Sequence, residues 1–423
     1  MKLFNIKELA FVIFLILLSA TSKSQMRVMS QDLQKRAIKS ISFFNTGGGY
    51  VCFEDKLAFT SDSGQNFVFK SINITNTNGY EIPANSTFIV NGAEAINKDT
   101  LFVYGLLASK PSILKSYDGA HTFEVVLHTS SRAHASAITD LKYNKSNQYL
   151  YAITNTQVFL SKDGGSVWEE KFYHDPIRGD GLFMNSIAFG LDSTMSVSAG
   201  FVYRSRYNVR SFNNGDSIGF DRFDPMEPPI GIFEYTQYIN DSTAYTNLNE
   251  NWYPGLKENT KLIKTVDTGK TWTDVALFDT VPSRKFHFVT AQKAYGFDTT
   301  NTVTITENGG LNWVPVKQDS LDVSDLVECF YFVDEHTFYT GGRNGVLKLY
   351  VAINYWLGTE DDNWHNPNNW SKREVPMETS IVKINANTSH NAVIKQNASC
   401  YNIEIQQGAT LTVAAGVSFK ITK

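Results

Sequence analysis

The most constraining feature of this sequence is an octet that recurs six times. Its best copies read SKDGGSVW at 161–168, TVDTGKTW at 265–272 and TENGGLNW at 306–313, with Ser or Thr first, Asp or Asn third, Gly fifth and an aromatic residue last. The third positions follow one another at intervals of 56, 45, 50, 54 and 41 residues, and they are Asp62, Asp118, Asp163, Asn213, Asp267 and Asn308. Repeats of ~40–50 residues rich in short strands are typical of the blades of a β-propeller.

The chemistry of the octet explains why it recurs. An Asp or Asn side chain bonds the backbone amides of a tight turn, Gly supplies the positive φ that such a turn needs, and the first Ser or Thr adds a second local bond. The final aromatic residue, which is Trp168, Trp272 or Trp313 in the best copies, starts the next strand and packs beneath the turn or between repeats. We therefore expect these octet turns to be structural and their acidic residues not to be catalytic.

The octets resemble those of the Asp-box, or BNR, family of propellers. That family includes sialidases, sortilin-type receptors, xyloglucanase-type glycosidases and photosystem II assembly factor-like proteins, and the resemblance covers about residues 40–352. It implies a propeller whose octet turns lie away from the ligand face. The stretch TGGRNGVLKLY at 340–350 is most similar to the photosystem II assembly factor-like group, which implies a protein partner.

The strand pattern around each octet predicts one blade. Around the third octet, four strand-like segments follow one another: SAITDLKYN, YLYAITN, QVFLSKDG and SVWEEKFYH. After the last octet a seventh unit has three such segments, and residues 27–39 can supply its fourth strand and close the ring, which removes an open sheet edge. We expect an all-β chain with a seven-bladed β-propeller over residues 25–352, although six or eight blades also fit the spacing.

From residue 353 the pattern changes. The stretch WLGTEDDNWHNPNNWS at 356–371 is followed by short segments whose apolar residues alternate with a period of two. It resembles the small β modules of bacterial surface proteins exported by the type IX route, so we expect residues 353–423 to form a small β-sandwich or β-solenoid-like module, either cut short or stacked on something. Asp361, Asp362 and His365 fit a polar turn better than a metal site, because their spacing is not that of a calcium loop.

The N-terminus has the features of a secretory signal peptide. Lys2 and Lys7 precede the apolar run LAFVIFLILL at 9–18, and small residues follow before Gln25. A run of this length is too short to span a bilayer. We expect residues 1–24 to be removed, no membrane span to remain, and the mature chain to be secreted or held at the cell surface.

Composition excludes several classes of function. The formal charge is −4 without any basic run, which argues against nucleic acid and against an anionic membrane surface. Cys52, Cys329 and Cys400 are too few for a disulfide framework; a Cys52–Cys329 bridge would join the ends of the larger domain, but buried free thiols fit better. No metal-ligand pair, P-loop or dinucleotide motif is present, so no cofactor and no metal are expected. We expect a monomer.

The resemblance places the ligand face where the fourth strand of one blade leads to the first strand of the next. Loops held by a rigid scaffold are where binding groups concentrate. The candidates on these connectors, and on a loop within the fifth blade, are Arg132, His134, Arg178, Asp180, Asp224, Trp252, Tyr253, Arg284 and His287. Trp252 and Tyr253 fit stacking on a sugar, anchoring of a protein partner, or simple covering of the blade edge.

The function expected from these features is binding rather than catalysis. A sialidase needs arginines around a substrate carboxylate, and that family has one in a Phe/Tyr–Arg–Ile–Pro stretch of the first blade, whereas KSISFFNTGGGYVCF at 39–53 has none. We expect a non-enzymatic binding or scaffold protein that presents its propeller face to a glycan or protein partner. The alternative is a glycoside hydrolase with a carboxylate pair on the same loops, such as Asp180 and Asp224, whose separation the sequence does not report.

Overall fold

The structure is a computed structural model. It describes residues 26–30, 36–45, 47–129, 137–174, 182–190, 194–201, 206–211, 213–222, 232–249, 260–277, 286–297, 303–315, 327–334, 337–351, 353–378 and 380–422.

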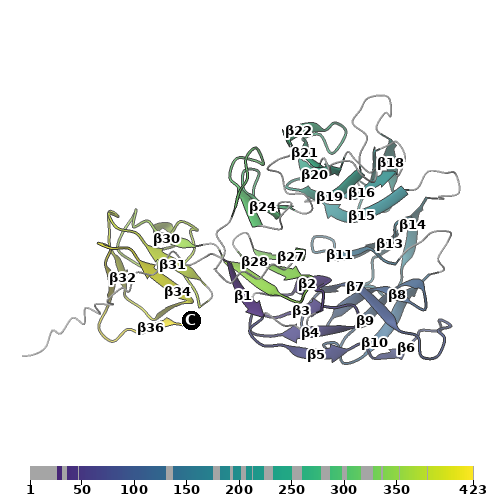
Figure 1. Ribbon diagram of the computed structural model, residues 1–423, viewed down its shortest axis with the longest axis horizontal. Helices are drawn as coiled ribbons and strands as arrows, with labels where there is room; N and C mark the ends of the chain where they lie inside the picture. Colours follow the sequence, from purple (N-terminus) through teal and green to yellow (C-terminus); the bar gives the residue numbers. More distant parts are fainter. Residues whose placement is uncertain are drawn as a thin grey trace, which may run out of the picture.

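Seven sheets lie around a common centre and form a β-propeller (Figure 1). We name them blades 1 to 7 in chain order. The first strands, nearest the centre, are β2 (Ser40–Phe43), β7 (Phe88–Ala95), β11 (Asp140–Asn144), β15 (Leu182–Phe189), β19 (Ile232–Tyr238), β23 (Phe286–Phe288) and β27 (Val327–Asp334). The second strands are β3 (Gly49–Cys52), β8 (Leu101–Leu107), β12 (Tyr149–Ile153), β16 (Met195–Phe201), β20 (Ala244–Asn249), β24 (Ala294–Phe297) and β28 (Thr337–Gly342).

The outer half of each blade contains the octet turn. The third strands are β4 (Lys56–Thr60), β9 (Lys110–Ser116), β13 (Gln157–Ser161), β17 (Arg206–Ser211), β21 (Thr260–Thr265), β25 (Val303–Thr306) and β29 (Leu347–Val351). The fourth strands of blades 1 to 6 are β5 (Val68–Ser71), β10 (Phe123–His128), β14 (Glu169–Tyr173), β18 (Gly219–Arg222), β22 (Thr273–Leu277) and β26 (Val314–Pro315). Every octet therefore joins a third strand to a fourth, as the sequence predicts.

The N-terminal strand β1 (Met26–Ser30) closes the ring. It pairs antiparallel with β29, with Met26 opposite Tyr350 and Arg27 opposite Leu349, and so becomes the fourth strand of blade 7. The seven-blade count and the closing strand are both confirmed. One strand was not expected: β6 (Ile74–Asn76) pairs parallel with β10 and gives blade 2 a fifth strand.

The propeller core is a series of apolar clusters between neighbouring blades. Blades 1 and 2, for example, share a cluster that contains Tyr50, Leu57, Val90 and Val103. Because each sheet has a neighbour on both faces, strands can be buried on both sides, and all five residues of β13 are buried. Cys52 and Cys329 lie in such clusters, and Cys400 lies in the core formed by the C-terminal residues; all three thiols are buried and none forms a disulfide, as expected.

The remaining strands form a β-solenoid-like module in which all strand pairs are parallel. Its elements are β30 (Asn354–Trp356), the 3₁₀ helix η2 (Pro367–Asn369), β31 (Ile381–Ile384), β32 (Ala392–Ile394), β33 (Ala398–Cys400), β34 (Asn402–Ile405), β35 (Leu411–Val413) and β36 (Phe419–Ile421). Sheets β30-β31-β34, β32-β35 and β33-β36 enclose three buried tryptophans, and Trp370 meets Trp356 and Trp364 edge-on at 5.0 and 4.7 Å between ring centroids.

The acidic stretch of the module is a polar turn. Asp361 accepts hydrogen bonds from the Asn363 amide (2.8 Å) and from the Asn369 side chain (2.6 Å), and Asp362 pairs with Lys395 at 2.6 Å. Among the residues described, no His, Cys, Asp or Glu cluster has the makings of a metal site. In the same part of the chain, no helix has the length and apolar character needed to cross a membrane.

Candidate functional site

The octet turns share one hydrogen-bond network. In the fifth octet, Thr265 Oγ1 donates to Asp267 Oδ1 (2.8 Å) and accepts from the Gly269 amide (2.9 Å), and Asp267 Oδ1 accepts from the Thr271 amide (2.9 Å). The same three bonds occur in all six octets, including the degenerate one at Ser211–Ile218. The four carboxylates and the two Asn side chains at this position therefore form hydrogen bonds inside the turn.

The closing tryptophans pack against the turns as well. The indole Nε1 of Trp168 donates to the Gly165 carbonyl at 3.1 Å, and that of Trp313 donates to the Gly310 carbonyl at 3.0 Å. Trp272 instead packs against Tyr238 and Ala244 of its own blade. The hydrogen bonds from the side chain and amide of Thr271 hold the pKa of Asp267 at about 2, so this carboxylate is ionised across the physiological range.

The octet turns of blades 1, 3 and 4 also bond to a neighbouring blade. Tyr151 of blade 3 donates its hydroxyl to the Asn214 carbonyl in the octet of blade 4 at 2.9 Å, and Tyr339 of blade 7 does the same to Ser63 of blade 1 at 3.0 Å. Lys115 of blade 2 reaches the Gly164 carbonyl in blade 3 at 2.6 Å. The octets therefore hold neighbouring blades together at one rim, which leaves the opposite rim and the inner wall as places for a ligand.

Most of the ligand-face candidates lie outside the described residues. These are Arg132, His134, Arg178, Asp180, Asp224, Trp252, Tyr253 and Arg284. His287 is described, and it belongs to β23 rather than to the connector before it. Its ring stacks on Phe332 of blade 7 with 3.9 Å between centroids, and burial lowers its pKa to about 4, so it is neutral at physiological pH.

The first strands of the seven blades form what we call the inner wall of the ring. Polar contacts join neighbouring blades at or beside this wall. Around the ring these are Ser40 Oγ accepting from the Ala93 amide (3.0 Å), Glu94 Oε1 from the Tyr143 amide (3.3 Å), Asp140 Oδ2 from the Ile187 amide (2.9 Å), Ser198 Oγ donating to Thr236 Oγ1 (2.7 Å), Gln237 Oε1 accepting from the Phe288 amide (2.6 Å), and Tyr331 Oη donating to the Phe43 carbonyl. With the His287–Phe332 stack, these contacts link all seven blades.

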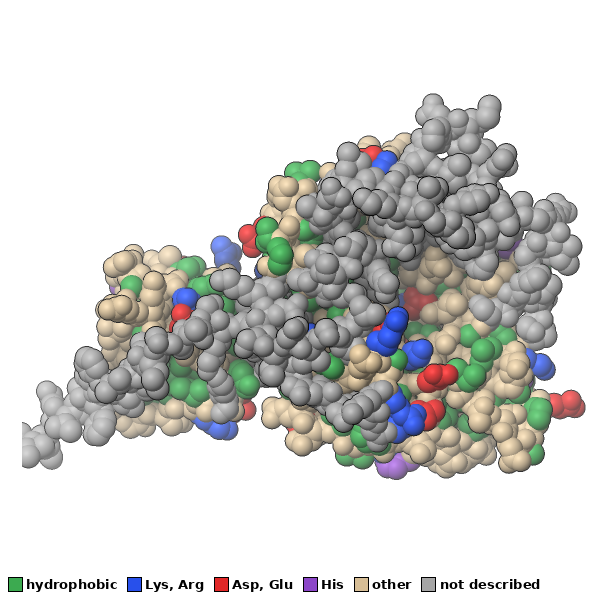
Figure 2. Space-filling view, in the orientation of Figure 1, with side chains coloured by type: hydrophobic (Ala, Val, Ile, Leu, Met, Phe, Trp, Pro, Cys, Tyr) green, Lys and Arg blue, Asp and Glu red, His purple; other side chains and the backbone are tan. Residues whose placement is uncertain are grey.

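Charged groups stand on this wall. Asp140 and Lys142 are two residues apart on β11, so their side chains leave the same face of the strand, 3.7 Å apart. The Asp140 carboxylate raises the pKa of Lys142, and so do Glu94 of blade 2 and Tyr235 of blade 5. Groups from three blades therefore act on one ammonium near the ring centre. Figure 2 shows side chains of both charges close together on the face in view, toward the region where Figure 1 places β8 and β9.

Glu94, Asp140 and Lys142 differ in their burial and in their hydrogen-bond partners. Burial raises the pKa of Glu94, although Lys142 and the bond from the Tyr143 amide act the other way. The Asp140 side chain is 11% exposed and holds the Ile187 amide, whereas the Lys142 side chain is 46% exposed. Burial, and after it the Glu94 carboxylate, raise the pKa of the nearby Tyr331 to about 12, so this phenol stays protonated. Because the Tyr331 hydroxyl already donates to the Phe43 carbonyl, the exposed donor that these groups offer to a ligand is the Lys142 ammonium.

Sequence reasoning missed these inner-wall residues because it looked for binding groups only in connectors. A signal was present: the alternation D-L-K in 140–142 puts two opposite charges on the same face of a predicted strand. Nothing in the sequence brings Glu94 or Tyr235 to that pair.

Comparisons with known proteins agree on the propeller. Residues 355–423 match a family model described as "Domain of unknown function (DUF8693)". No curated protein matches the sequence. Among solved structures, "YCF48 bound to D1 peptide" is similar at TM-score 0.54 and 14% identity, over 79% of this chain and 99% of that one. YCF48 from Cyanidioschyzon merolae is similar at 0.53 and 12%, over 77% and 98%.

A glycosidase is among the similar structures too. The GH74 xyloglucanase from Xanthomonas campestris matches at TM-score 0.53 and 13% identity, over 78% of this chain and 54% of that one. The chain has a propeller of the kind found in YCF48 and in GH74 enzymes. At these identities the likeness concerns the fold, and the match spans nearly all of YCF48 but about half of the xyloglucanase.

Proposed function

We propose that this chain is a non-enzymatic binding protein whose propeller takes an extended segment of a partner protein at the rim opposite the octet turns and along the inner wall beside it. The observation that carries the proposal is the use of the charged groups on that wall. The carboxylates of Glu94 and Asp140 each hold an amide of the next blade, while the Lys142 side chain stays 46% exposed. Such a wall is built to bind rather than to transfer protons.

The chemistry of the wall favours a ligand rich in acceptors. A lysine ammonium has three N–H donors and no acceptor, and Asp140 uses only part of that capacity. The backbone carbonyls of an extended peptide are such acceptors. The likeness to YCF48, whose solved structure holds a D1 peptide, supports this choice.

Other parts of the proposal come from the sequence. We take residues 1–24 as a signal peptide, residues 25–352 as an Asp-box propeller, and residues 353–423 as a module like those of type IX-exported bacterial surface proteins. The protein is then secreted or displayed at the cell surface, as a monomer. A glycan is the other partner that the exposed loops would suit, through Trp252 and Tyr253.

A peptide selection tests the proposal. The full mature chain is immobilised, a phage-displayed random dodecapeptide library is selected on it, and enriched peptides are titrated by fluorescence anisotropy. Lys142→Met is expected to weaken binding at least about tenfold, because one hydrogen bond to a charged group is worth roughly 1.5–3 kcal/mol. The matched control is Lys162→Met, which removes an octet-rim lysine paired with Asp216. Failure to enrich any peptide, or equal affinity of the Lys142→Met variant, counts against the proposal.

The second candidate is a glycoside hydrolase, which the similarity to a GH74 xyloglucanase favours. A general acid needs a raised pKa and a second carboxylate at about 5–9.5 Å. Asp180 and Asp224 are the loop carboxylates that would serve. Turnover of xyloglucan oligosaccharides by the full chain, abolished in Asp180→Asn or Asp224→Asn, would replace the binding proposal.

A further inference from the structure

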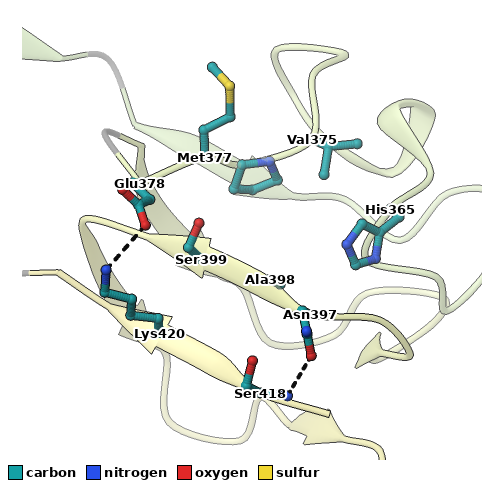
Figure 3. A pocket seen from close by; sticks show the side chains of 10 residues that line it. His365, Val375, Met377, Glu378, Asn397, Ala398, Ser399, Ser418 and Lys420 are labelled. Atoms are coloured by element: carbon teal, nitrogen blue, oxygen red, sulfur yellow. Dashed lines mark hydrogen bonds and ion pairs between the residues drawn. The ribbon is translucent and has the colours of Figure 1, made fainter. Parts of the chain in front are cut away.

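The C-terminal module has a surface groove that is lined only by its own residues. It has a volume of about 550 Å³ and lies between β33, β36 and the segment 375–378, as Figure 3 shows. This volume is within the range of roughly 300–1,000 Å³ that is usual for small-ligand sites.

The floor of the groove is a grid of small polar side chains. In the parallel pair of β33 and β36, Ser399 stands opposite Lys420, while Ala398 and Phe419 pack into the module core. Because side chains alternate along a strand, Asn397 and Ser418 lie on the same outer face as Ser399 and Lys420. The Ser418 amide donates to Asn397 Oδ1 at 3.0 Å, which fixes the side-chain amide in place.

Two further elements complete the groove. Val375, Pro376 and Met377 form an apolar wall, and Met377 is 60% exposed. On the other side is His365, whose Nδ1 atom is buried and has no hydrogen-bond partner among the described residues. A buried polar atom without a hydrogen-bond partner destabilises the fold, so a ligand or water that bonds it is favoured.

The charges at the groove cancel. Lys420 and Glu378 form an ion pair at 3.3 Å at one end (Figure 3), so neither an anion nor a cation meets an uncompensated opposite charge. A purely apolar ligand would strip water from the two serine hydroxyls and the Asn397 amide without replacing their bonds. The ligand that matches is neutral, carries many hydroxyls that donate and accept, and has one apolar face for the Pro376–Met377 wall.

We infer that this groove is a binding site for a neutral carbohydrate chain. Sugar hydroxyls pair with Ser399, Ser418, the Asn397 amide and His365, and the C–H face of a ring lies on Met377. The site is separate from the propeller wall, so the module would attach the protein to a polysaccharide while the propeller binds its own ligand.

The test uses the full mature chain on an array of defined neutral, sialylated and sulfated oligosaccharides, followed by calorimetric titration of the best neutral one. Ser399→Trp places an indole on the groove floor and is expected to weaken binding at least ~tenfold. Thr412→Trp is the matched control, because Thr412 is also exposed at the middle of an edge strand, β35, in another sheet of the module. His365→Phe keeps an aromatic ring at this position, removes its nitrogens and is expected to weaken binding severalfold.

The outcomes separate the alternatives. Neutral-glycan binding that Ser399→Trp abolishes and Thr412→Trp preserves supports the site. Selection of sulfated or sialylated glycans, lost in Lys420→Gln, overturns it in favour of an anion site. Binding that survives Ser399→Trp, or no glycan binding by the intact chain, also overturns it, as does a peptide that competes for the groove. Near-UV circular dichroism of the buried tryptophans confirms that each variant keeps the module fold.

Discussion

Replacement of Asp267 tests whether the octets hold the ring together. Asp267→Ala removes three hydrogen bonds at once: from Thr265 Oγ1 (2.8 Å), from the Thr271 amide (2.9 Å) and from Thr271 Oγ1 (2.7 Å). Asp267→Asn can keep all three. The chain itself contains the precedent, because Asn213 accepts the Ser217 amide at 2.9 Å through Oδ1 and donates through Nδ2 to Ser217 Oγ at 2.8 Å.

The expected magnitudes differ clearly. Each intramolecular hydrogen bond contributes about 0.5–1.5 kcal/mol net, and this turn is solvated, so the loss from Asp267→Ala is about 1.5–3 kcal/mol. Asp267→Asn loses only the assistance of the charge and is expected to cost less than about 1 kcal/mol. Asp99→Ala, which removes an exposed carboxylate close to the octet of blade 2, is expected to lie within about 0.5 kcal/mol of the parent.

Urea unfolding of the full mature chain, followed by tryptophan fluorescence, measures these differences as shifts in the midpoint. Two results would refute the reasoning. One is an Asp267→Ala variant as stable as Asp99→Ala. The other is an Asp267→Asn variant as unstable as the alanine variant, which would mean that the charge and not the bonded turn is what matters.

Three further predictions use the same unfolding assay. First, the pKa of Asp267 is held at about 2, below its ordinary value, so the stability from its ionisation is present above about pH 4 and is lost as the pH falls towards 2. The greater stability of the parent over Asp267→Asn should therefore disappear in that window. A difference that persists at pH 2 contradicts this. Second, Gly165→Ala should cost at least about 1 kcal/mol more than Gly164→Ala: both residues have positive φ (+87° and +72°), but a Cβ on Gly165 would meet the Phe102 ring at 2.4 Å, whereas one on Gly164 meets nothing within 4 Å. Equal losses would show that the octet has no packing role. Third, Glu94→Gln should raise the urea midpoint at pH 7 but not at pH 4. Burial raises the pKa of Glu94, so its ionised form destabilises the fold once the pH rises above the ordinary pKa of a glutamate, about 4.3. A lower midpoint at pH 7 would mean that the charge of Glu94 is needed beside Lys142.

The propeller could be predicted because the residues that form each octet turn all lie within the octet itself. A hydroxyl, a carboxylate or amide, and a residue at the tight bend lie within eight residues, so even the copy that ends in Ile218 forms the same turn as the copies that end in tryptophan. The strand β6 was not predictable, since three residues of a connector pair with Phe123 and Glu124 almost fifty residues away, and the segment ITN carries no strong strand signal. His287 was expected in a connector because the start of β23 has no turn residue to mark it.

The environment of the charged pair on the inner wall could not be predicted from the sequence. The pair Asp140 and Lys142 is visible as an alternation on one strand, but its environment is made by Glu94 and Tyr235, which come from blades 2 and 5. Only closure of the ring brings these blades to face one another. The contacts that join blades, such as Glu94 to the Tyr143 amide, follow from strand register, which the sequence pattern fixes only to the face of the strand and not to the residue.

The octet rim and the inner wall differ in how far their polar groups are already hydrogen-bonded within the protein, and this difference indicates what each does. At the octet rim, side-chain oxygens of the octets bond their own turns, and backbone carbonyls such as those of Asn214 and Ser63 are taken by tyrosines of the neighbouring blade. On the inner wall, Glu94 and Asp140 are committed to amides while Lys142 is not fully used. A buried or bonded group contributes to stability, whereas a group with spare hydrogen-bonding capacity at an accessible surface contributes to recognition. By this criterion the octet rim stabilises the ring and the inner wall binds, so a Lys142 variant should lose ligand affinity, and an Asp267 variant should lose stability while keeping its ligand.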